Sequence, residues 1–542
     1  MNQRCHLVVG ALVASVLSGC HCTQTAAICV TNTDCTHGMS CINGQCGFPS
    51  SGDGGDGGNS DGGKGDGGNG DGGCVNLACD QVNCPDGGTT TVTGTVYDPS
   101  GQVPIYNALV YVPNGQVLPF TPGVSCDRCE SFTSGSPLVV ALTGSDGTFT
   151  LQNVPVIPDG GTLPLVIQVG RWRRQVALPA VPACTSTPIT DAGTTRLPRN
   201  QSEGDIPQMA IATGGADPFE CLLLKMGISP SEFTNPDAGG RVHYYVSDSP
   251  GPGLDKVPPA PPESALLNDA GTLMNYDVVL LPCEGGEYRR NNVGNPQPQN
   301  LVQYTAAGGR LFTTHYGYSW LAFPENNPFP STGVWAPGGC DAYNTTLSTT
   351  VDQSFAKGAS FGQWLLNVGS STQLGTLNLI ESRHDLLFTD GGSQRWLYAN
   401  IPPPVPSCSP TVECGCTSQP APAVLHMTFN TPLDAGTLPD GGPGNQCGRV
   451  VYSDFHVSAS AAGTGTFPTA CHPGALSAQE KALLFMLMDV SSCVQSDNPT
   501  CGTLGQSCSQ GSPCCGTLGC VDSTGHPCAG GVIACTCQPG LR

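Results

Sequence analysis

The stretch GGRLFTTHYGYSWL, Gly308–Leu321, carries the pattern on which the fold prediction rests. Apolar residues behind two glycines predict a buried strand, residues 313–317 predict a sharp turn, and residues 318–321 begin a new apolar segment. A strand, a tight turn and a helix start is the arrangement by which α/β proteins present a reactive side chain above a sheet. The side chain at this turn is His315.

Strand and helix patterns alternate on both sides of this stretch. QMAIATGG, RVHYYV and YDVVLLPCEGG have the apolar runs of buried strands, whereas DPFECLLLKMGI and PQNLVQYTAAG have helical spacing. The alternation predicts a doubly wound α/β domain over residues 205–493, with a Cys-rich insertion at 402–446. Ligands of such sheets lie at the carboxyl ends of the strands, which here are TGGAD, CEGGE and TTHYG.

The composition of the chain indicates an exported protein. Its 542 residues include 30 cysteines, too many for a reducing compartment, so most are expected to form disulfides. Acidic residues outnumber basic ones 41 to 20, which makes nucleic acid a poor partner. Gly and Pro are abundant and charged residues make up only 11%, as in β-sandwiches and loop-rich domains.

The N-terminus predicts a lipid anchor. Arg4 precedes the short apolar run LVVGALVASVL, which is typical of a signal peptide over residues 1–19. LSGC, ending at Cys20, resembles a bacterial lipobox, and the resemblance implies that Cys20 carries the lipid that holds the protein on the membrane. His21 follows Cys20, in place of the aspartate that often retains lipoproteins at the inner membrane. An outer-membrane or cell-surface location is therefore expected. An ordinary signal peptide with a chance cysteine is the alternative.

Small modules are expected at both ends of the mature chain. Within residues 20–50, CVTNTDCTHGMSCINGQC holds four closely spaced cysteines, Cys29, Cys35, Cys41 and Cys46, which favour two disulfides over a zinc site because paired C-x-x-C spacings are lacking. Residues 51–73 consist mainly of Asp and Gly and predict a flexible linker; a calcium-binding β-roll would need apolar residues in each turn. Residues 501–542, with eight cysteines, resemble knottin-like modules, with four disulfides expected and zinc as the minor alternative.

Residues 74–200 are expected to form an antiparallel β-sandwich of about seven strands. TVTGTVYDPSG, ALVYVP, GSDGTFTLQNVP and LPLVIQVGRWRRQVALP alternate apolar and polar residues between turns. GTVYDPSGQVPIYNALVYV and GSDGTFTLQNVP resemble carboxypeptidase regulatory-like domains, which implies a structural or adhesive module without catalytic residues. The basic cluster Arg171–Arg174 is expected on an exposed edge strand, where charge prevents edge-to-edge pairing. A docking patch for an acidic glycan or for the linker is the alternative.

The α/β domain resembles the class I glutamine amidotransferase-like fold, and within it the trehalose-utilisation (ThuA-like) branch. The resemblance rests on AAGGRLFTTHYG with His315 and on CGRVVYSDFHVS with His456. His315 stands where the amidotransferases place a nucleophilic cysteine, so glutamine hydrolysis through a thioester is not expected.

Two strand-end histidines predict a candidate site. His315 and His456 could converge with Glu284 and Asp454, in an arrangement that suits a divalent metal, acid–base work on a sugar hydroxyl, or hydrogen bonding to a saccharide. Three aromatic residues close by could stack on a sugar ring: Tyr316, Tyr318 and Trp320. The alternative is a set of packing residues around a vestigial cleft.

Nine cysteines in the α/β domain leave one without a partner if its disulfides stay within the domain. Cys221 and Cys283 are the candidates for a free thiol. A nucleophilic role for Cys283 is not favoured, because no histidine lies near it in the sequence.

Together these features predict a lipid-anchored cell-surface protein of non-catalytic or binding type, with a glycan or a protein as ligand. A carbohydrate-modifying enzyme or a metal-dependent hydrolase that uses the strand-end histidines is the alternative. A divalent metal is the one cofactor considered.

Overall fold

The protein divides into two units, residues 1–72 and 73–542. The computed structural model describes residues 74–495 except for 86, 130–132, 159, 214–215, 248–258, 289–293, 337–345, 402–420, 436–444 and 458–465, and also parts of 497–539. Of the first unit it describes the antiparallel strands β1 (Ser40–Ile42) and β2 (Gln45–Gly47). The predicted signal peptide, the lipidation site Cys20 and the linker 51–73 lie outside the described residues. No helix within the described part of the chain has the length and apolar character needed to cross a membrane.

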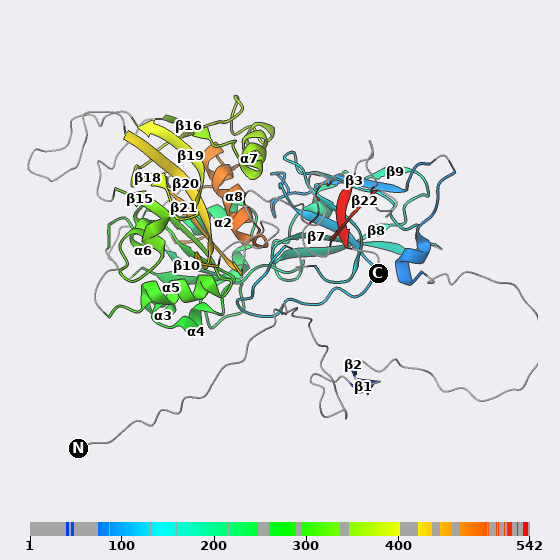
Figure 1. Ribbon diagram of the computed structural model, residues 1–542, viewed down its shortest axis with the longest axis horizontal. Helices are drawn as coiled ribbons and strands as arrows, with labels where there is room; N and C mark the ends of the chain where they lie inside the picture. Colours follow the sequence, from blue (N-terminus) through cyan, green and yellow to red (C-terminus); the bar gives the residue numbers. More distant parts are fainter. Residues whose placement is uncertain are drawn as a thin grey trace, which may run out of the picture. The chain divides into compact units, whose positions relative to one another are not determined.

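Residues 74–200 form two small sheets that share one apolar core (Figure 1). The first has the order β6-β3-β9 and the second β5-β4-β7-β8. The strands are β3 (Thr91–Thr95), β4 (Leu109–Pro113), β5 (Pro137–Leu142), β6 (Thr148–Leu151), β7 (Thr162–Val169), β8 (Trp172–Pro179) and β9 (Ser186–Pro188). Alternation of buried and exposed residues, as in β6, places one face of a strand in the core. Two helical turns, η2 (Asn76–Asp80) and α1 (Ala192–Thr195), flank the strands.

Residues 205–495 are built on a ten-stranded mixed sheet of order β11-β12-β10-β13-β14-β21-β20-β19-β16-β17. The strands from β11 to β21 pair in parallel, and those from β21 to β17 pair antiparallel. The parallel strands are β10 (Met209–Thr213), β11 (Phe233–Thr234), β12 (Val242–Val246), β13 (Val278–Leu281), β14 (Arg310–Thr314) and β21 (Gly448–Ser453). The others are β16 (Leu347–Val351), β17 (Thr376–Leu379), β19 (Gln394–Ile401) and β20 (Ala421–Thr431).

Helices lie against both faces of this sheet. One apolar cluster joins alternate residues of the parallel strands to α2 (Phe219–Lys225), α7 (Ala356–Asn367) and α8 (Ala478–Ser491). The other cluster joins the intervening residues to α3 (Glu263–Leu267), α4 (Ala270–Leu273), α5 (Gln297–Ala306) and α6 (Ser319–Ala322). Because both faces are covered, β10, β13, β14 and β21 are buried along their whole length, which explains why none of them alternates apolar and polar residues.

The predicted insertion at 402–446 is partly wrong. Residues 421–431 form β20, which pairs with β19 and β21 inside the large sheet. The prediction failed because Cys- and Pro-rich sequence on both sides of APAVLHMTFNT obscured a strand of eleven residues.

The remaining short elements are the turns η3 (Pro230–Glu232), η5 (His315–Tyr318) and η6 (Phe329–Thr332) and the strand pair β15 (Gly333–Trp335) and β18 (Leu386–Thr389).

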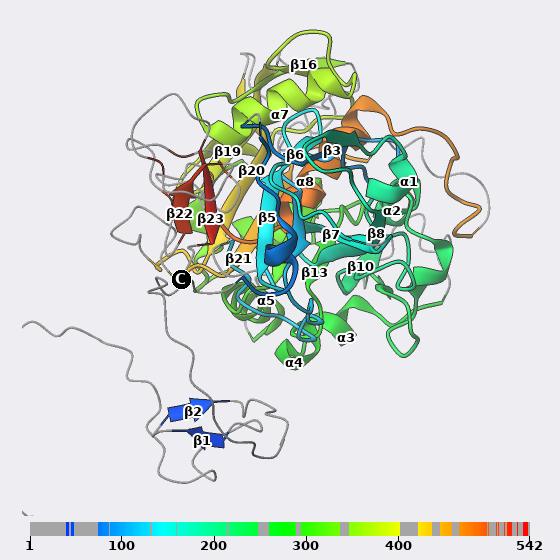
Figure 2. The ribbon, with the colours of Figure 1, turned by 90° about the vertical axis from the view of Figure 1, so that its right-hand side faces the viewer.

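Disulfides are numerous, as expected. The described ones are Cys74–Cys79, Cys84–Cys184, Cys126–Cys447, Cys129–Cys493, Cys221–Cys471, Cys508–Cys520, Cys514–Cys537 and Cys528–Cys535. The last three tie together the C-terminal module with its strand pair β22 (Leu518–Val521) and β23 (Thr536–Pro539), drawn in red in Figure 2. The other two cysteines of this module, Cys501 and Cys515, lie outside the described residues, so the fourth expected disulfide stays a prediction.

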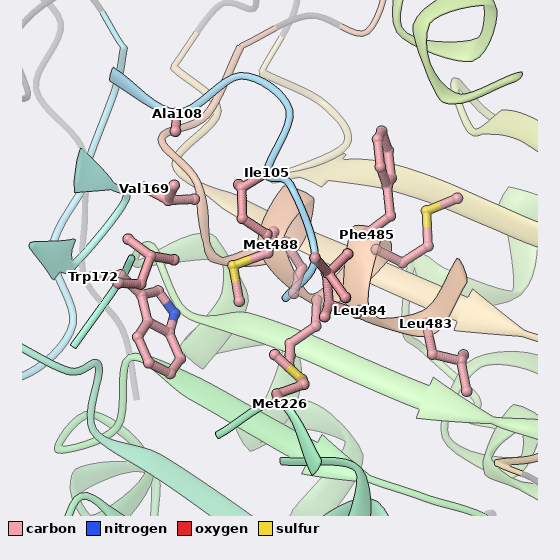
Figure 3. Close-up of a cluster of buried hydrophobic side chains, with 14 of the residues drawn as sticks. Ile105, Ala108, Val169, Trp172, Met226, Leu483, Leu484, Phe485 and Met488 are labelled. Carbon is pink, nitrogen blue, oxygen red and sulfur yellow. The ribbon is translucent and has the colours of Figure 1, made fainter. Parts of the chain in front are cut away.

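The sandwich and the large sheet share a buried interface. Trp172 and Ile105 of the sandwich lie in the same apolar cluster as Leu484 and Phe485 of α8 (Figure 3). Arg171 is 8% exposed and pairs with Asp127 and Asp277. The predicted exposure of the basic cluster is therefore wrong at Arg171 and also at Arg173, which is 3% exposed and pairs with Asp205, because both side chains face acidic partners instead of solvent.

Candidate functional site

Three neighbouring parallel strands, β13, β14 and β21, end at one edge of the large sheet. The register pairs Leu281 of β13 with Thr313 of β14, and Thr314 of β14 with Ser453 of β21. The segments that follow these strands carry Cys283, His315 and His456, so adjacent strand ends bring the three side chains together. The predicted convergence of His315 and His456 is therefore present in the structure.

His315 stands at the centre of this cluster. Its Nδ1 atom lies 2.9 Å from Nε2 of His456 and 3.2 Å from Sγ of Cys283. The backbone of His315 has a φ of 37°, in the left-handed region that residues other than glycine rarely adopt. Such strain persists only where the surroundings enforce it, and the tight turn at η5 directs the imidazole toward the ends of β13 and β21.

The outer nitrogens of both imidazoles face carboxylates. Nε2 of His315 lies 3.6 Å from Oδ2 of Asp385, and Nδ1 of His456 lies 3.7 Å from Oε2 of Glu381. Both carboxylates come from the segment that connects β17, the edge strand of the antiparallel half of the large sheet, to β18 of the separate β15–β18 pair. The backbone of Glu381 is also left-handed, with a φ of 54°.

The two imidazoles are held in different protonation states. Burial, followed by the charges of His456 and Arg383, puts the pKa of His315 well below its usual value. Burial also opposes charge on His456, but Asp217 and hydrogen bonds with Cys283 and Glu381 outweigh it and raise the pKa of His456 to about 10. Near neutral pH, Nε2–H of a protonated His456 therefore donates to Nδ1 of a neutral His315.

The two predicted carboxylates have other roles. Asp454 accepts a hydrogen bond from the Tyr452 hydroxyl at 2.8 Å and one from the backbone N–H of Asp385 at 2.7 Å, so it braces the segment that faces His315. Burial raises the pKa of Asp454. Glu284 accepts a hydrogen bond from Ser247 at 2.7 Å. Neither belongs to the group of donor atoms that converge at His315.

The predicted stacking residues are mostly core residues. Tyr318 is fully buried and Trp320 is 1% exposed, so neither ring can lie against a sugar in this conformation, and the prediction is wrong for both. They pack in the cluster beneath α5 because the chain continues as η5 and α6 after the turn instead of opening a cleft. Tyr316 is half-buried, and its ring lies 3.8 Å from that of His315.

Cys283 is the site residue that the sequence prediction passed over. Among the described cysteines it is the free one. The sequence predicted a free thiol at either Cys221 or Cys283, and Cys221 is disulfide-bonded to Cys471. Distance along the sequence concealed its neighbour, because 32 residues separate Cys283 from His315. The signal was available: LLPC ends one predicted strand and TTH ends the next predicted strand along the chain, and the carboxyl ends of parallel strands lie at the same edge of a sheet.

Comparisons with known proteins are weak. No family model matches the chain, and no curated protein sequence does either. One similar solved structure is a ThuA-like protein from Bacteroides uniformis, 11% identical, with 52% of this chain and 88% of that chain covered and a TM-score of 0.26. Another is a type II cohesin–X-dockerin complex from Acetivibrio cellulolyticus, 15% identical, with 26% of this chain and 85% of that chain covered and a TM-score of 0.14. The likeness to the ThuA-like protein is loose.

Proposed function

We propose that this chain is an exported surface protein, anchored by lipid at Cys20, that binds a ligand without turning it over. The observation that carries the proposal is the burial of the strand-end site: Cys283 is fully buried, and His315 and His456 are 2% and 6% exposed. Side chains that act on a substrate have to touch it, whereas these contact one another. The eight described disulfides support export.

The ligand is a glycan or a protein that contacts the outer surface of the molecule. The net charge of −21 disfavours nucleic acid. We also assign residues 205–493 to a doubly wound domain of the ThuA-like kind. Parallel strands covered by helices on both faces, and histidines after β14 and β21, support this assignment.

The second candidate function is a carbohydrate-modifying enzyme or metal-dependent hydrolase. It is favoured by the opposite pKa shifts of His315 and His456, because a neutral and a protonated imidazole side by side form a ready base and acid. Because His315 and His456 are buried, this function requires the segments packed over them to open for the substrate.

One experiment separates the two candidates. The full mature chain, in detergent, is incubated with a panel of bacterial and plant glycans, and both retention on the glycan and release of reducing sugar are measured. Retention without release, unchanged in His315→Gln, is the expected result. Release that His315→Gln abolishes would overturn the binding proposal and support the enzyme.

The anchor has its own test. Mass spectrometry of the N-terminal peptide is expected to show acyl chains on Cys20, and Cys20→Ala is expected to leave the membrane fraction. An N-terminal peptide without acyl chains in the wild type would remove the anchor from the proposal.

A further inference from the structure

Three side chains of metal-binding type meet at the strand ends. Cys283, His315 and His456 each offer one donor atom, and these atoms lie within 4.8 Å of one another. One thiol and two imidazoles form a donor set that suits zinc and similar borderline-soft cations and is poorly suited to Mg²⁺ or Ca²⁺. The three donors come from the ends of β13, β14 and β21, which are rigid, fully buried strands.

The spacing of the donors fits a tetrahedral ion after a small expansion. Zn–N bonds of about 2.0–2.1 Å and Zn–S bonds of about 2.3 Å place tetrahedral ligand atoms roughly 3.3–3.6 Å apart. The observed separations from Nδ1 of His315 are 2.9 Å to His456 and 3.2 Å to Cys283, which are hydrogen-bonding distances. An ion that replaces the shared protons would lengthen these two separations by a few tenths of an ångström.

The outer nitrogens supply an independent indication. Histidines that bind metals almost always turn their second ring nitrogen toward a carboxylate, a backbone carbonyl or water, which fixes the tautomer and makes the ligand nitrogen more basic. Here both outer nitrogens face a carboxylate at slightly more than hydrogen-bonding distance, Nε2 of His315 3.6 Å from Asp385 and Nδ1 of His456 3.7 Å from Glu381. Asp454 holds the backbone of Asp385 in place. A histidine pair that served only as packing would have no need of two carboxylates from a different part of the sheet.

The state of Cys283 points the same way. The other cysteines whose side chains the structure describes are paired in disulfides, whereas Cys283 is free and buried beside two imidazoles. A thiolate bound to a metal and shielded from solvent escapes oxidation. Glu381 and Asp385 offset the positive charge that an ion and two neutral imidazoles would bring.

We propose that Cys283, His315 and His456 form a zinc-class metal centre, with Asp385 and Glu381 as the carboxylates that orient the two imidazoles. The fourth position of the tetrahedron is left for a water molecule or an anion. This centre differs from the one expected from the sequence, because Cys283 replaces Glu284 and Asp454 as a ligand. It does not depend on whether the chain binds a glycan, a protein or neither.

The test is a metal titration of the full mature chain with its disulfides intact. The chain is stripped with a chelator and titrated with Co²⁺, whose thiolate charge-transfer absorption and d–d bands report sulfur ligation and geometry; Zn²⁺ content is measured in parallel by elemental analysis. We expect one tightly bound ion per chain, a charge-transfer band in the wild type, and loss of that band in Cys283→Ser. His456→Gln is expected to weaken binding at least 100-fold.

Two further variants keep the test decisive. His243→Gln is the matched control, because His243 is also buried but contacts Tyr276 away from the site, and it is expected to bind Co²⁺ as the wild type does. Asp385→Asn leaves all three ligands in place and is expected to weaken Co²⁺ binding about 10–100-fold. If Cys283→Ser does not fold, Co²⁺ binding by Asp385→Asn tests the proposal in its place. A wild-type chain that binds no Co²⁺ in stoichiometric amount, or a band unaffected by both Cys283→Ser and Asp385→Asn, would overturn the proposal.

Discussion

At the scale of single residues, His426 couples the stability of the large sheet to pH. The side chain lies on β20, fully buried, with Nδ1 2.7 Å from the Ser453 hydroxyl and its ring against those of Phe312 and Trp396. Burial foremost lowers its pKa to about 3, although Asp489 and Asp497 partly oppose that effect and Arg449 adds to it.

Acid is therefore expected to destabilise the protein through His426. In the unfolded chain a histidine has a pKa of about 6.5, so between about pH 3 and pH 6.5 the unfolded state binds more protons and stability falls as the pH falls. From about pH 7 to pH 4.5 one such group accounts for roughly 2–3 kcal/mol. Urea unfolding at pH 7 and at pH 4.5 measures this effect. The free energy of unfolding that is lost between the two pH values should be smaller by this amount in His426→Gln than in the wild type. An equal loss in the two proteins would show that other groups set the acid sensitivity.

The part of the candidate site that lies at the ends of parallel strands could be predicted from the sequence. His315 and His456 follow strands with clear apolar runs, and the convergence of such ends is a property of the sheet. Cys283 obeys the same rule and could have been included. Glu381 and Asp385 could not, because they come from a segment whose place beside His315 depends on antiparallel pairings that no sequence pattern indicated.

At the scale of elements, α8 shows why some boundaries are readable from sequence. SAQE predicts a capping box, and the structure has both of its hydrogen bonds, from the N–H of Glu480 to Ser477 and from the N–H of Ser477 to Glu480. These contacts are local, so four residues suffice to predict them. The strand β20 could not be predicted from local sequence. Its partners β19 and β21 are separated from it by segments rich in Cys, Pro and Gly, so the pairing depends on contacts between distant residues.

Loss of this cap is expected to cost about 1 kcal/mol. In Ser477→Ala the N–H of Glu480 loses its acceptor at the start of a helix that is buried along most of its length, and N-cap replacements of this kind cost about 0.5–2 kcal/mol. The measurement is chemical denaturation. Ser354→Ala removes a hydroxyl that bonds only the side chain of Asp352 at the surface and should change stability by less than about 0.5 kcal/mol. Equal effects of the two variants would contradict the role of the cap.

At the scale of the whole molecule, the sandwich and the large sheet were predicted as separate domains but share a core. One apolar cluster runs from the strands of the sandwich through α8 to the parallel strands. Trp364 of α7 donates a hydrogen bond to the Pro104 carbonyl at 2.8 Å, and two disulfides, Cys126–Cys447 and Cys129–Cys493, cross the interface. Periodicity within a segment reveals which face is apolar but not which other segment will cover it, so no sequence pattern indicated this shared core.

The shared core predicts that residues 74–495 unfold in a single transition. Replacing both interface disulfides, with all four cysteines changed to Ala, is expected to lower stability by roughly 6–10 kcal/mol, because they close loops of 321 and 364 residues in the unfolded chain. The control pair Cys74→Ala and Cys79→Ala opens a loop of only 5 residues and should cost about 2 kcal/mol. Calorimetry is expected to show one transition in all three proteins, since the buried apolar contacts across the interface survive the loss of the disulfides. Two transitions in the wild type would mean that the sandwich and the large sheet are independent domains joined only by covalent bonds.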